Sequence, residues 1–169
     1  PRFTMLETIR AYALERLDEL GEGEEVARRH AEYFLTLAER VAQERWVLPT
    51  VDWPAYEREL GNFRSALAWL DAHDDVERTV RLAVSIPFSR FGYVAEGWEW
   101  CERALPRLPE VSKPVKARAL RNASFVGAWQ GELTSSRAWA EEAIALYRQL
   151  GDRIDEAKCL LSLSTIAAL

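Results

Sequence analysis

Four basic and two aromatic side chains in the second half of the chain are suited to binding an anion. They are Arg90, Arg118, Arg121, Phe125, Trp129 and Lys158. Arg118 and Arg121 lie one helical turn apart, so they share one face of a helix, and the same holds for the two aromatic residues. Arginine binds carboxylates and phosphates through a planar, bidentate guanidinium group, and aromatic rings suit an apolar or planar group. These residues predict a ligand or peptide site; in the alternative, the arginines are solvated and the rings pack against a neighbouring repeat.

No pattern in the sequence predicts catalysis. The chain lacks a glycine-rich phosphate loop, and Gly21-Glu22-Gly23 is typical of a helix end. Its two histidines are isolated and its two cysteines are far apart, so we expect no metal site. His30 falls on an apolar stripe and is expected to be a hydrogen-bonded core residue, whereas Cys101 and Cys159 are expected to be small buried hydrophobes. The chain is therefore expected not to be an enzyme and to bind neither a cofactor nor a metal.

The amino-acid composition favours a folded protein and argues against a disordered, membrane-spanning or secreted one. Of the 169 residues, 49% are hydrophobic and 29% are charged, and the net charge is −5, which predicts a folded protein with a sizeable core. The low cysteine count, the absence of an apolar run of roughly 20 residues and the absence of a signal peptide favour the cytoplasm. The basic excess after residue 75 is too small to favour direct nucleic-acid binding. Because the chain begins at Pro1 and stops within an apolar helical pattern, we expect a fragment of a longer protein.

Residues 1–74 are expected to be helical. Apolar residues recur at helical spacing and predict helices over residues 4–20, 24–45 and 52–70. Thr4 and Glu7 have the spacing of a capping box, and Asp52 is suited to be an N-cap. Three such amphipathic helices are expected to pack as an antiparallel bundle. No sheet is expected, apart from a short strand at residues 1–4.

Residues 75–169 contain an internal repeat. Gly92 aligns with Gly131, 39 residues later, and Trp100 aligns with Trp139. One helix is predicted before each glycine, over residues 76–90 and 116–130, and a second helix is predicted after it. Such helix pairs predict about two and a half tetratricopeptide-like repeats, the last one truncated, in an all-α, right-handed solenoid. The excess over a period of about 34 residues is expected to be a proline-bearing loop.

The first helix of each repeat is expected to line a concave groove, and the second helix is expected to support it from outside. Besides the six candidate residues, the predicted groove face carries Thr79, Leu82, Ile86, Ser89, Ala128, Leu161 and Thr165. Trp98, Trp100 and Trp139 fall on the supporting helices, which predicts core positions for them.

Several segments resemble one bacterial group of regulators. These segments are residues 2–13 (RFTMLETIRAYA), 29–34 (RHAEYF), 59–69 (ELGNFRSALAW) and 92–105, the first repeat. They resemble the large STAND-type proteins that combine an NB-ARC-like ATPase, a winged helix and tetratricopeptide repeats, known as LuxR-family, AfsR-like or MalT-like transcriptional regulators. The resemblance spans nearly the whole chain and implies that the ATPase and the winged helix lie upstream. The chain departs from the pattern at Pro87, inside a repeat helix, and at Ser136, where the repeats usually have alanine.

The resemblance and the groove predict a non-catalytic sensor or protein-interaction arm of a signal-responsive, ATP-dependent transcriptional regulator. A protein or small-molecule effector in the groove would bias the upstream ATPase between resting and assembling states. One alternative is a passive scaffold of a signalling ATPase, with a homodimer formed through the apolar C-terminal helix. Direct binding of nucleic acid by the slightly basic second half is a more distant alternative, and no contact with a membrane is expected.

Overall fold

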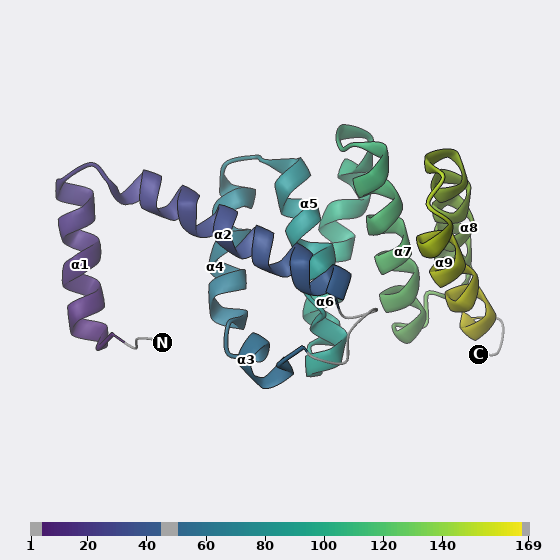
Figure 1. Ribbon diagram of the computed structural model, residues 1–169, viewed down its shortest axis with the longest axis horizontal. Coiled ribbons are helices and arrows are strands. Elements are labelled where there is room, and N and C mark those ends of the chain that lie inside the picture. The colour runs from purple at the N-terminus through teal and green to yellow at the C-terminus, as the bar shows by residue number, and fades with distance from the viewer. Residues whose placement is uncertain (1–4, 45–50, 167–169) are drawn as a thin grey trace.

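The computed structural model describes residues 5–44 and 51–166, and all regular secondary structure in these ranges is helical. The expected all-α class is therefore confirmed for these ranges. The strand predicted at residues 1–4 and Thr4 of the predicted capping box lie outside the described residues. The helices form an elongated array that begins with α1 at one end and finishes with α8 and α9 at the other (Figure 1).

The described part of the chain contains nine α-helices and two 3-10 helices. In chain order they are α1 (Glu7–Glu19), α2 (Gly23–Glu44), α3 (Trp53–Glu57), α4 (Leu60–Ala72), α5 (Val76–Ser85), η1 (Phe88–Phe91), α6 (Val94–Ala104), η2 (Leu105–Glu110), α7 (Lys113–Trp129), α8 (Leu133–Leu150) and α9 (Arg153–Ile166). The longest of them, α2, packs against α4 and α5.

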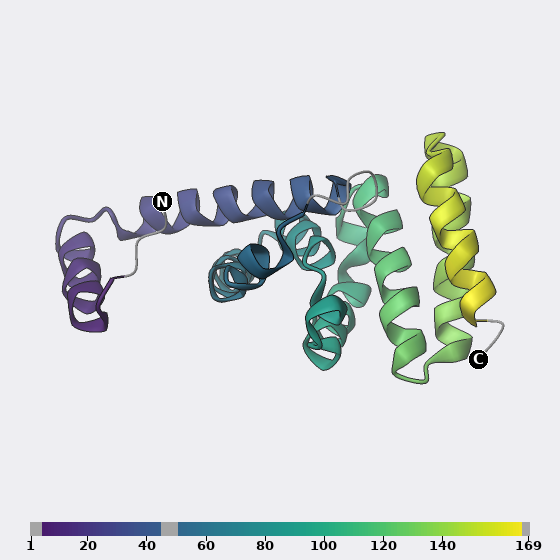
Figure 2. The same ribbon diagram turned by 60° about the horizontal axis from the view of Figure 1, so that its bottom comes forward.

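The first helix does not pack as the sequence suggests. Leu6, Ile9 and Leu20, on its predicted apolar stripe, are more than half exposed, and α1 lies apart from the main body (Figures 1 and 2). The expected antiparallel bundle is wrong in its first helix: α2 packs against α4 as predicted, but its remaining apolar face is covered by α5 and not by α1. Helical periodicity predicts that a face is apolar, but it does not say which element covers that face.

The helix predicted over residues 52–70 is divided into α3 and α4. Asp52 caps α3 as predicted, and its Oδ1 accepts a hydrogen bond of 3.0 Å from the backbone N–H of Ala55. The apolar stripe continues through both helices, so that Tyr56 of α3 and Phe63 of α4 are both buried. The division therefore changes the path of the chain without exposing its core residues.

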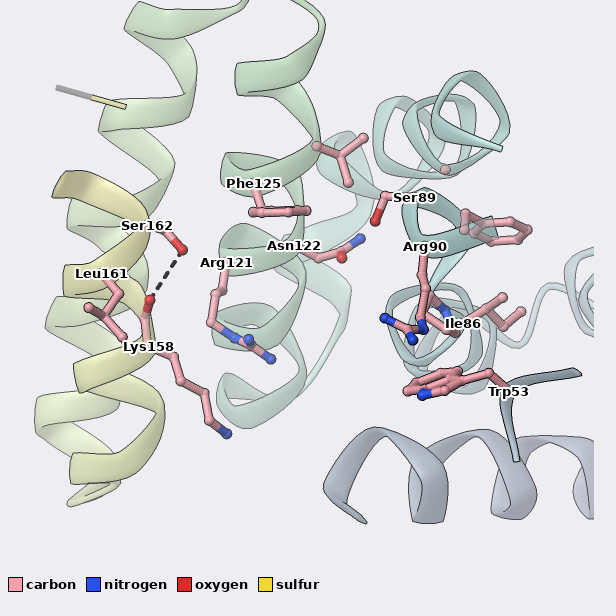
Figure 3. A pocket seen from close by; sticks show the side chains of 14 residues that line it. Trp53, Ile86, Ser89, Arg90, Arg121, Asn122, Phe125, Lys158, Leu161 and Ser162 are labelled. Carbon is pink, nitrogen blue, oxygen red and sulfur yellow. Dashed lines mark hydrogen bonds between the residues drawn. The ribbon is translucent and has the colours of Figure 1, made fainter. Parts of the chain in front are cut away.

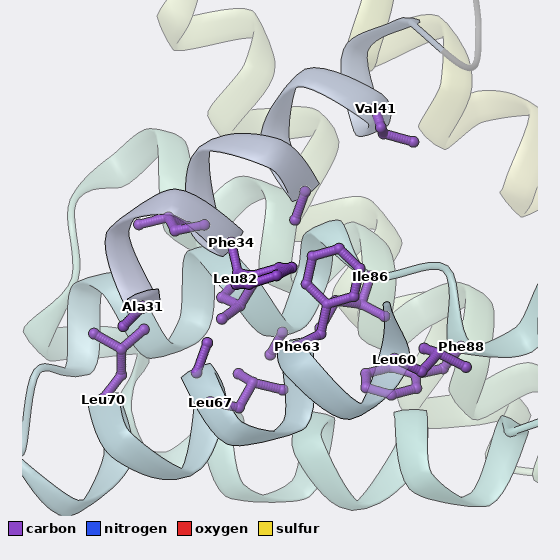
Figure 4. Close-up of a cluster of buried hydrophobic side chains, with 14 of the residues drawn as sticks. Ala31, Phe34, Val41, Leu60, Phe63, Leu67, Leu70, Leu82, Ile86 and Phe88 are labelled. Atoms are coloured by element: carbon purple, nitrogen blue, oxygen red, sulfur yellow. The ribbon is translucent and has the colours of Figure 1, made fainter. Parts of the chain in front are cut away.

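The largest apolar cluster lies where α2, α4 and α5 meet (Figure 4). Phe63 and Leu82 are fully buried there, and Phe34 of α2 meets Phe63 edge to face with ring centroids 5.3 Å apart. Ile86 extends the cluster toward η1. The first predicted repeat helix is therefore packed directly on the helices that precede it.

A proline interrupts this repeat helix. The sequence favours one helix over residues 76–90, but α5 ends at Ser85 and the chain continues as the 3-10 helix η1. Pro87 has no backbone N–H and disfavours helical geometry in the residue before it. Ile86 accordingly has an extended conformation, with φ −77° and ψ 123°. The expectation of a continuous helix is wrong for this reason, and Arg90 lies in a separate element.

The two aligned glycines have the same backbone conformation. Gly92 (φ 82°) and Gly131 (φ 86°) are left-handed, and each lies two residues before the next helix, α6 or α8. Glycine adopts this conformation without steric cost because it has no Cβ atom. The proline-bearing connection between α6 and α7, expected to be a loop, is largely the 3-10 helix η2.

Helix α7 packs closely against α6 and α8. A Cβ atom on Gly127 would lie 2.8 Å from Oγ of Ser136 and 3.0 Å from the ring of Trp139, so a larger residue would displace these side chains. The rings of Trp98 and Trp139 have centroids 6.0 Å apart, and both pack against the same apolar cluster. These two tryptophans are partly buried and pack against the core, which is close to the core positions that the sequence predicts.

Replacing Phe63 by alanine should destabilise the fold far more than the same change at Phe125. Phe63 is fully buried and Phe125 is 43% exposed. Phe63→Ala loses apolar burial and leaves a cavity, which costs about 3–5 kcal/mol, whereas Phe125→Ala should cost less than about 1 kcal/mol. Urea unfolding measures the free energy of unfolding of both variants. An equal decrease in the two variants would contradict the full burial of Phe63.

Candidate ligand-binding pocket

A pocket of about 490 Å³ lies between Trp53 and η1 on one side and α7 and α9 on the other (Figure 3). This volume is within the range of small-molecule sites. Fourteen residues line the pocket: Trp53, Ile86, Pro87, Phe88, Ser89, Arg90, Gly97, Arg121, Asn122, Phe125, Val126, Lys158, Leu161 and Ser162. Four of the six candidate residues predicted from the sequence are among them, and the other two are not.

Arg90 and Trp53 form one wall of the pocket. The guanidinium carbon of Arg90 lies 4.2 Å from the centroid of the Trp53 ring, and this cation–π contact favours one position of the exposed arginine side chain. Trp53 in turn packs against Tyr56 and Phe91, with ring centroids 6.3 Å and 6.1 Å away. Within the described residues no carboxylate forms an ion pair with Arg90.

Arg121 and Phe125 belong to the opposite wall, one turn apart on α7 (Figure 3). The Nε atom of Arg121 is buried and has no hydrogen-bond partner in the described part of the chain. Behind it, burial raises the pKa of Tyr147 to about 12 and the pKa of Cys159 to about 11, and the positive charge of Arg121 opposes both shifts. Both groups are therefore neutral at pH 7, and neither one neutralises the arginine.

Lys158 lines the same wall from α9. Its Nζ atom lies 2.5 Å from Oδ1 of Asp155, one turn earlier on the helix. Oγ of Ser162, one turn later, donates a hydrogen bond of 3.1 Å to the carbonyl oxygen of Lys158. The charge of this lysine is thus shared with Asp155, which does not itself line the pocket.

The pocket has two chemically different ends. The charged groups of Arg90, Arg121 and Lys158 gather toward one end, and the ring of Phe125 lies toward the other (Figure 3). None of the fourteen lining residues is an aspartate or a glutamate. Such a site suits an anion that is attached to an apolar group.

Arg118 lies on α7 but outside the pocket. Its guanidinium group donates a hydrogen bond of 2.7 Å to Oγ of Ser85 and lies 3.4 Å from a carboxylate oxygen of Glu39. Positions three residues apart differ by about 60° around a helix axis, and this is enough to direct Arg118 toward α2 and α5. The paired clamp of Arg118 and Arg121, expected from their spacing, is therefore absent from the pocket.

Glu39, Arg81 and Arg118 form an ion cluster that joins α2, α5 and α7, here called the Glu39 cluster. Arg81 donates two hydrogen bonds, of 2.9 Å and 2.7 Å, to the two carboxylate oxygens of Glu39. Burial by itself would raise the pKa of Glu39, but the hydrogen bonds and charges of the two arginines outweigh it and lower this pKa below its ordinary value. The ionised carboxylate therefore stabilises the contact between the three helices.

Trp129 also lies outside the pocket. It is 66% exposed, and its ring meets that of Phe125 edge to face with centroids 6.5 Å apart. Of the two aromatic residues predicted to form the floor of the site, only Phe125 lines it. Trp129 continues the aromatic surface along α7 beyond the pocket.

Trp53, Asn122 and Ser162 line the pocket although they were not predicted to do so. Ser162 lies four residues after Lys158, so helical spacing from that lysine is a signal that would have indicated it. Asn122 follows Arg121 directly and carries no such signal. Trp53 belongs to an apolar helical stripe, which indicates a core position, and only the fold brings it to Arg90.

His30 and the two cysteines lie outside the pocket lining. Nε2 of His30 lies 3.5 Å from Oδ1 of Asn62, so the predicted hydrogen bond is present, but the side chain is partly buried and does not lie in the core. Both cysteines are buried, as predicted. Within residues 5–44 and 51–166, no group of three or more His, Cys, Asp or Glu side chains is arranged to hold a metal ion. No helix in these two ranges has the length and apolar character required to cross a membrane.

The chain is similar to three mycobacterial proteins named "Putative HTH-type transcriptional regulator", one from Mycobacterium bovis and two from strains of Mycobacterium tuberculosis. Each is 32% identical to it over 168 residues, and the match covers 89% of this chain and 18% of the relative. The chain thus spans less than a fifth of the length of these relatives. No protein-family model and no solved structure matches it.

The Glu39 cluster should make stability depend on pH. Because the pKa of Glu39 is lowered in the folded chain, its contribution is fully present above the pKa of an unfolded glutamate, about 4.3. It is lost as the pH falls through the lowered value. Glu39→Gln should therefore reduce the free energy of unfolding by about 1–3 kcal/mol at pH 7, and by less at pH 3.

Glu141→Gln is the matched control, because Glu141 forms an exposed pair with Arg137 one turn away on α8. It should change the free energy of unfolding by no more than about 0.5 kcal/mol at either pH. Urea unfolding at the two pH values measures both variants. A loss for Glu39→Gln that is the same at pH 7 and pH 3 would rule out the ionised cluster as its cause.

Proposed function

We propose that this chain is a non-catalytic sensor and interaction arm of a signal-responsive, ATP-dependent transcriptional regulator, and that its pocket holds the ligand or peptide that is sensed. The main support for this proposal is the pocket, which is lined by Trp53, Arg90, Arg121 and Lys158 from four different elements. The similarity to three proteins named as HTH-type transcriptional regulators supports the regulatory role.

The proposed architecture is a right-handed, tetratricopeptide-like solenoid over residues 75–169 that follows a helical segment over residues 1–74. In this scheme α5 with η1 pairs with α6, α7 pairs with α8, and α9 opens a third repeat. The equivalent conformations of Gly92 and Gly131 support this pairing. The first helix of each repeat lines the groove of such an array, and the pocket is lined mainly by η1, α7 and α9, which occupy these positions.

In this proposal the arm acts on an ATPase and a winged-helix domain of the same chain, as in the STAND-type regulators that it resembles. A ligand shifts such a protein between two states only if it binds one state more tightly than the other. The regulator is cytoplasmic, and the arm itself needs no cofactor and no metal. With a net charge of −5, the arm repels nucleic acid, so DNA contacts belong to other parts of the regulator.

A second function, that of a passive scaffold which self-associates, is favoured by the surface of α9. Ile154 and Leu160 on this helix are 72% and 47% exposed, and a second copy of the chain would remove both from water. The scaffold predicts a homodimer that dissociates in the Leu160→Asp variant. Light scattering at several micromolar concentrations measures the mass, and a monomer throughout would contradict the scaffold.

The sensor role predicts that a pocket variant changes gene expression. We expect Arg121→Gln, introduced into the gene that encodes this chain, to alter the set of transcripts whose levels respond to the regulator. It removes one of the three positive charges that line the pocket while keeping most of the length of the side chain. Arg137→Gln is the control, since Arg137 is exposed on α8 and pairs only with nearby Glu141 in the described part of the chain.

Sequencing of total RNA from the three strains measures this effect. The proposal requires that the Arg121→Gln strain differs from the parent strain and that the Arg137→Gln strain does not. Identical transcript profiles in all three strains, with the variant protein present at normal abundance, would refute the sensor role.

A further inference from the structure

We infer that the ligand of the pocket is a small, planar aromatic carboxylate, held by its anionic group between Arg90 and Arg121 with its ring against Phe125. This inference rests on the proposed function, because it names the class of ligand for the same pocket. It excludes an extended acidic peptide, which the sequence alone leaves as an equal candidate.

The cationic end of the pocket lacks an internal anion. Arg90 and Arg121 project into the pocket from opposite walls (Figure 3), and no carboxylate in the described ranges forms an ion pair with either one. A carboxylate placed between the two guanidinium groups would accept charge-assisted hydrogen bonds from both, which are about twice as strong as neutral ones.

The guanidinium group of Arg90 is positioned before a ligand arrives, and packing of α7 fixes the backbone that carries Arg121. Arg90 lies over the ring of Trp53 at 4.2 Å, and Arg121 extends from a helix that is packed on both sides by α6 and α8. Preorganised donors lose little conformational entropy on binding. Lys158 adds positive charge to the same wall even though it pairs with Asp155, so the pocket keeps an excess of positive charge.

The other end of the pocket favours a flat apolar group. Phe125 is 43% exposed, and the apolar residues Ile86, Phe88 and Val126 also line the pocket. A planar ring covering Phe125 would gain a ring–ring contact in addition to burial of apolar surface. Arg121 and Phe125 are one helical turn apart along α7, which matches a carboxylate attached directly to a ring system.

The size of the pocket favours a small molecule over an extended peptide as its ligand. A volume of about 490 Å³ fits a bicyclic acid with solvent to spare. An extended peptide would need a groove that continues along α7, but the next aromatic residue, Trp129, does not line the pocket. The occupant is therefore compact.

Isothermal titration calorimetry with three probes tests this assignment. The probes are 2-naphthoate, 2-naphthalenemethanol, which has the same rings without the charge, and cyclohexanecarboxylate, which has the charge without a planar ring. We expect 2-naphthoate to bind at least about tenfold more tightly than either of the others. Equal binding of 2-naphthoate and the alcohol would overturn recognition of the anion, and equal binding of the two acids would overturn recognition of the ring.

Variants on both walls locate the bound probe. Arg90→Gln and Arg121→Gln should each weaken 2-naphthoate binding by about tenfold, and Phe125→Ala should weaken it by about fivefold. Arg137→Gln should leave the affinity unchanged. Because Arg90 is exposed on a short surface element, its variant remains informative even if Arg121→Gln destabilises the chain. Affinity that is unchanged in Arg90→Gln and Phe125→Ala would overturn the assignment.

The failure of this inference differs from the failure of the proposed function. If Arg121→Gln changes the transcripts but no naphthoate binds, the ligand class is wrong and the sensor role stands. If naphthoate binds as described while the transcripts stay unchanged, the ligand class stands and the sensor role is wrong.

Discussion

The position of the pocket depends on the break in the chain between α5 and η1. Pro87 ends the helix because it has no N–H group and forces Ile86 into an extended conformation. After this break η1 turns Arg90 onto the ring of Trp53, which makes the wall opposite α7. A helix that continued to Arg90 would carry this arginine along the axis of α5 instead. Because Pro87 lacks a backbone N–H, the chain forms a pocket with two charged walls at this point and not a regular pair of helices.

Helix α7 connects the pocket with the rest of the fold. Arg121 and Phe125 face the pocket, while Arg118, one turn earlier, belongs to the Glu39 cluster and contacts α2. Close packing at Gly127 holds the same helix against α8. A ligand that neutralises Arg121 therefore acts on a helix that also contacts α2 through the ion pair of Arg118 and Glu39. Helix α7 thus connects the pocket physically with the N-terminal helices.

Local chemistry could be predicted from the sequence more completely than tertiary contacts. Helical spacing predicted most of the helices and the N-cap at Asp52. Arg121, Phe125 and Lys158, which it placed on one groove face, line the pocket, and their role in binding a ligand stays a prediction. The spacing could not show that Arg118 would meet Glu39, since that partner lies on a helix far away in sequence. Helical spacing also could not predict that Trp53 lines the pocket or that the apolar stripe of α1 is exposed. Periodicity describes one helix and says nothing of the elements that pack against it.

A crystal structure of the chain grown with 2-naphthoate tests most directly whether this pocket holds an aromatic anion between its two walls. We expect a carboxylate within hydrogen-bond distance of both Arg90 and Arg121, with the naphthalene ring against Phe125 and with Trp53 still beneath the guanidinium group of Arg90. A naphthoate bound elsewhere on the surface, or a pocket in which Arg121 pairs with a carboxylate of the chain itself, would contradict this expectation.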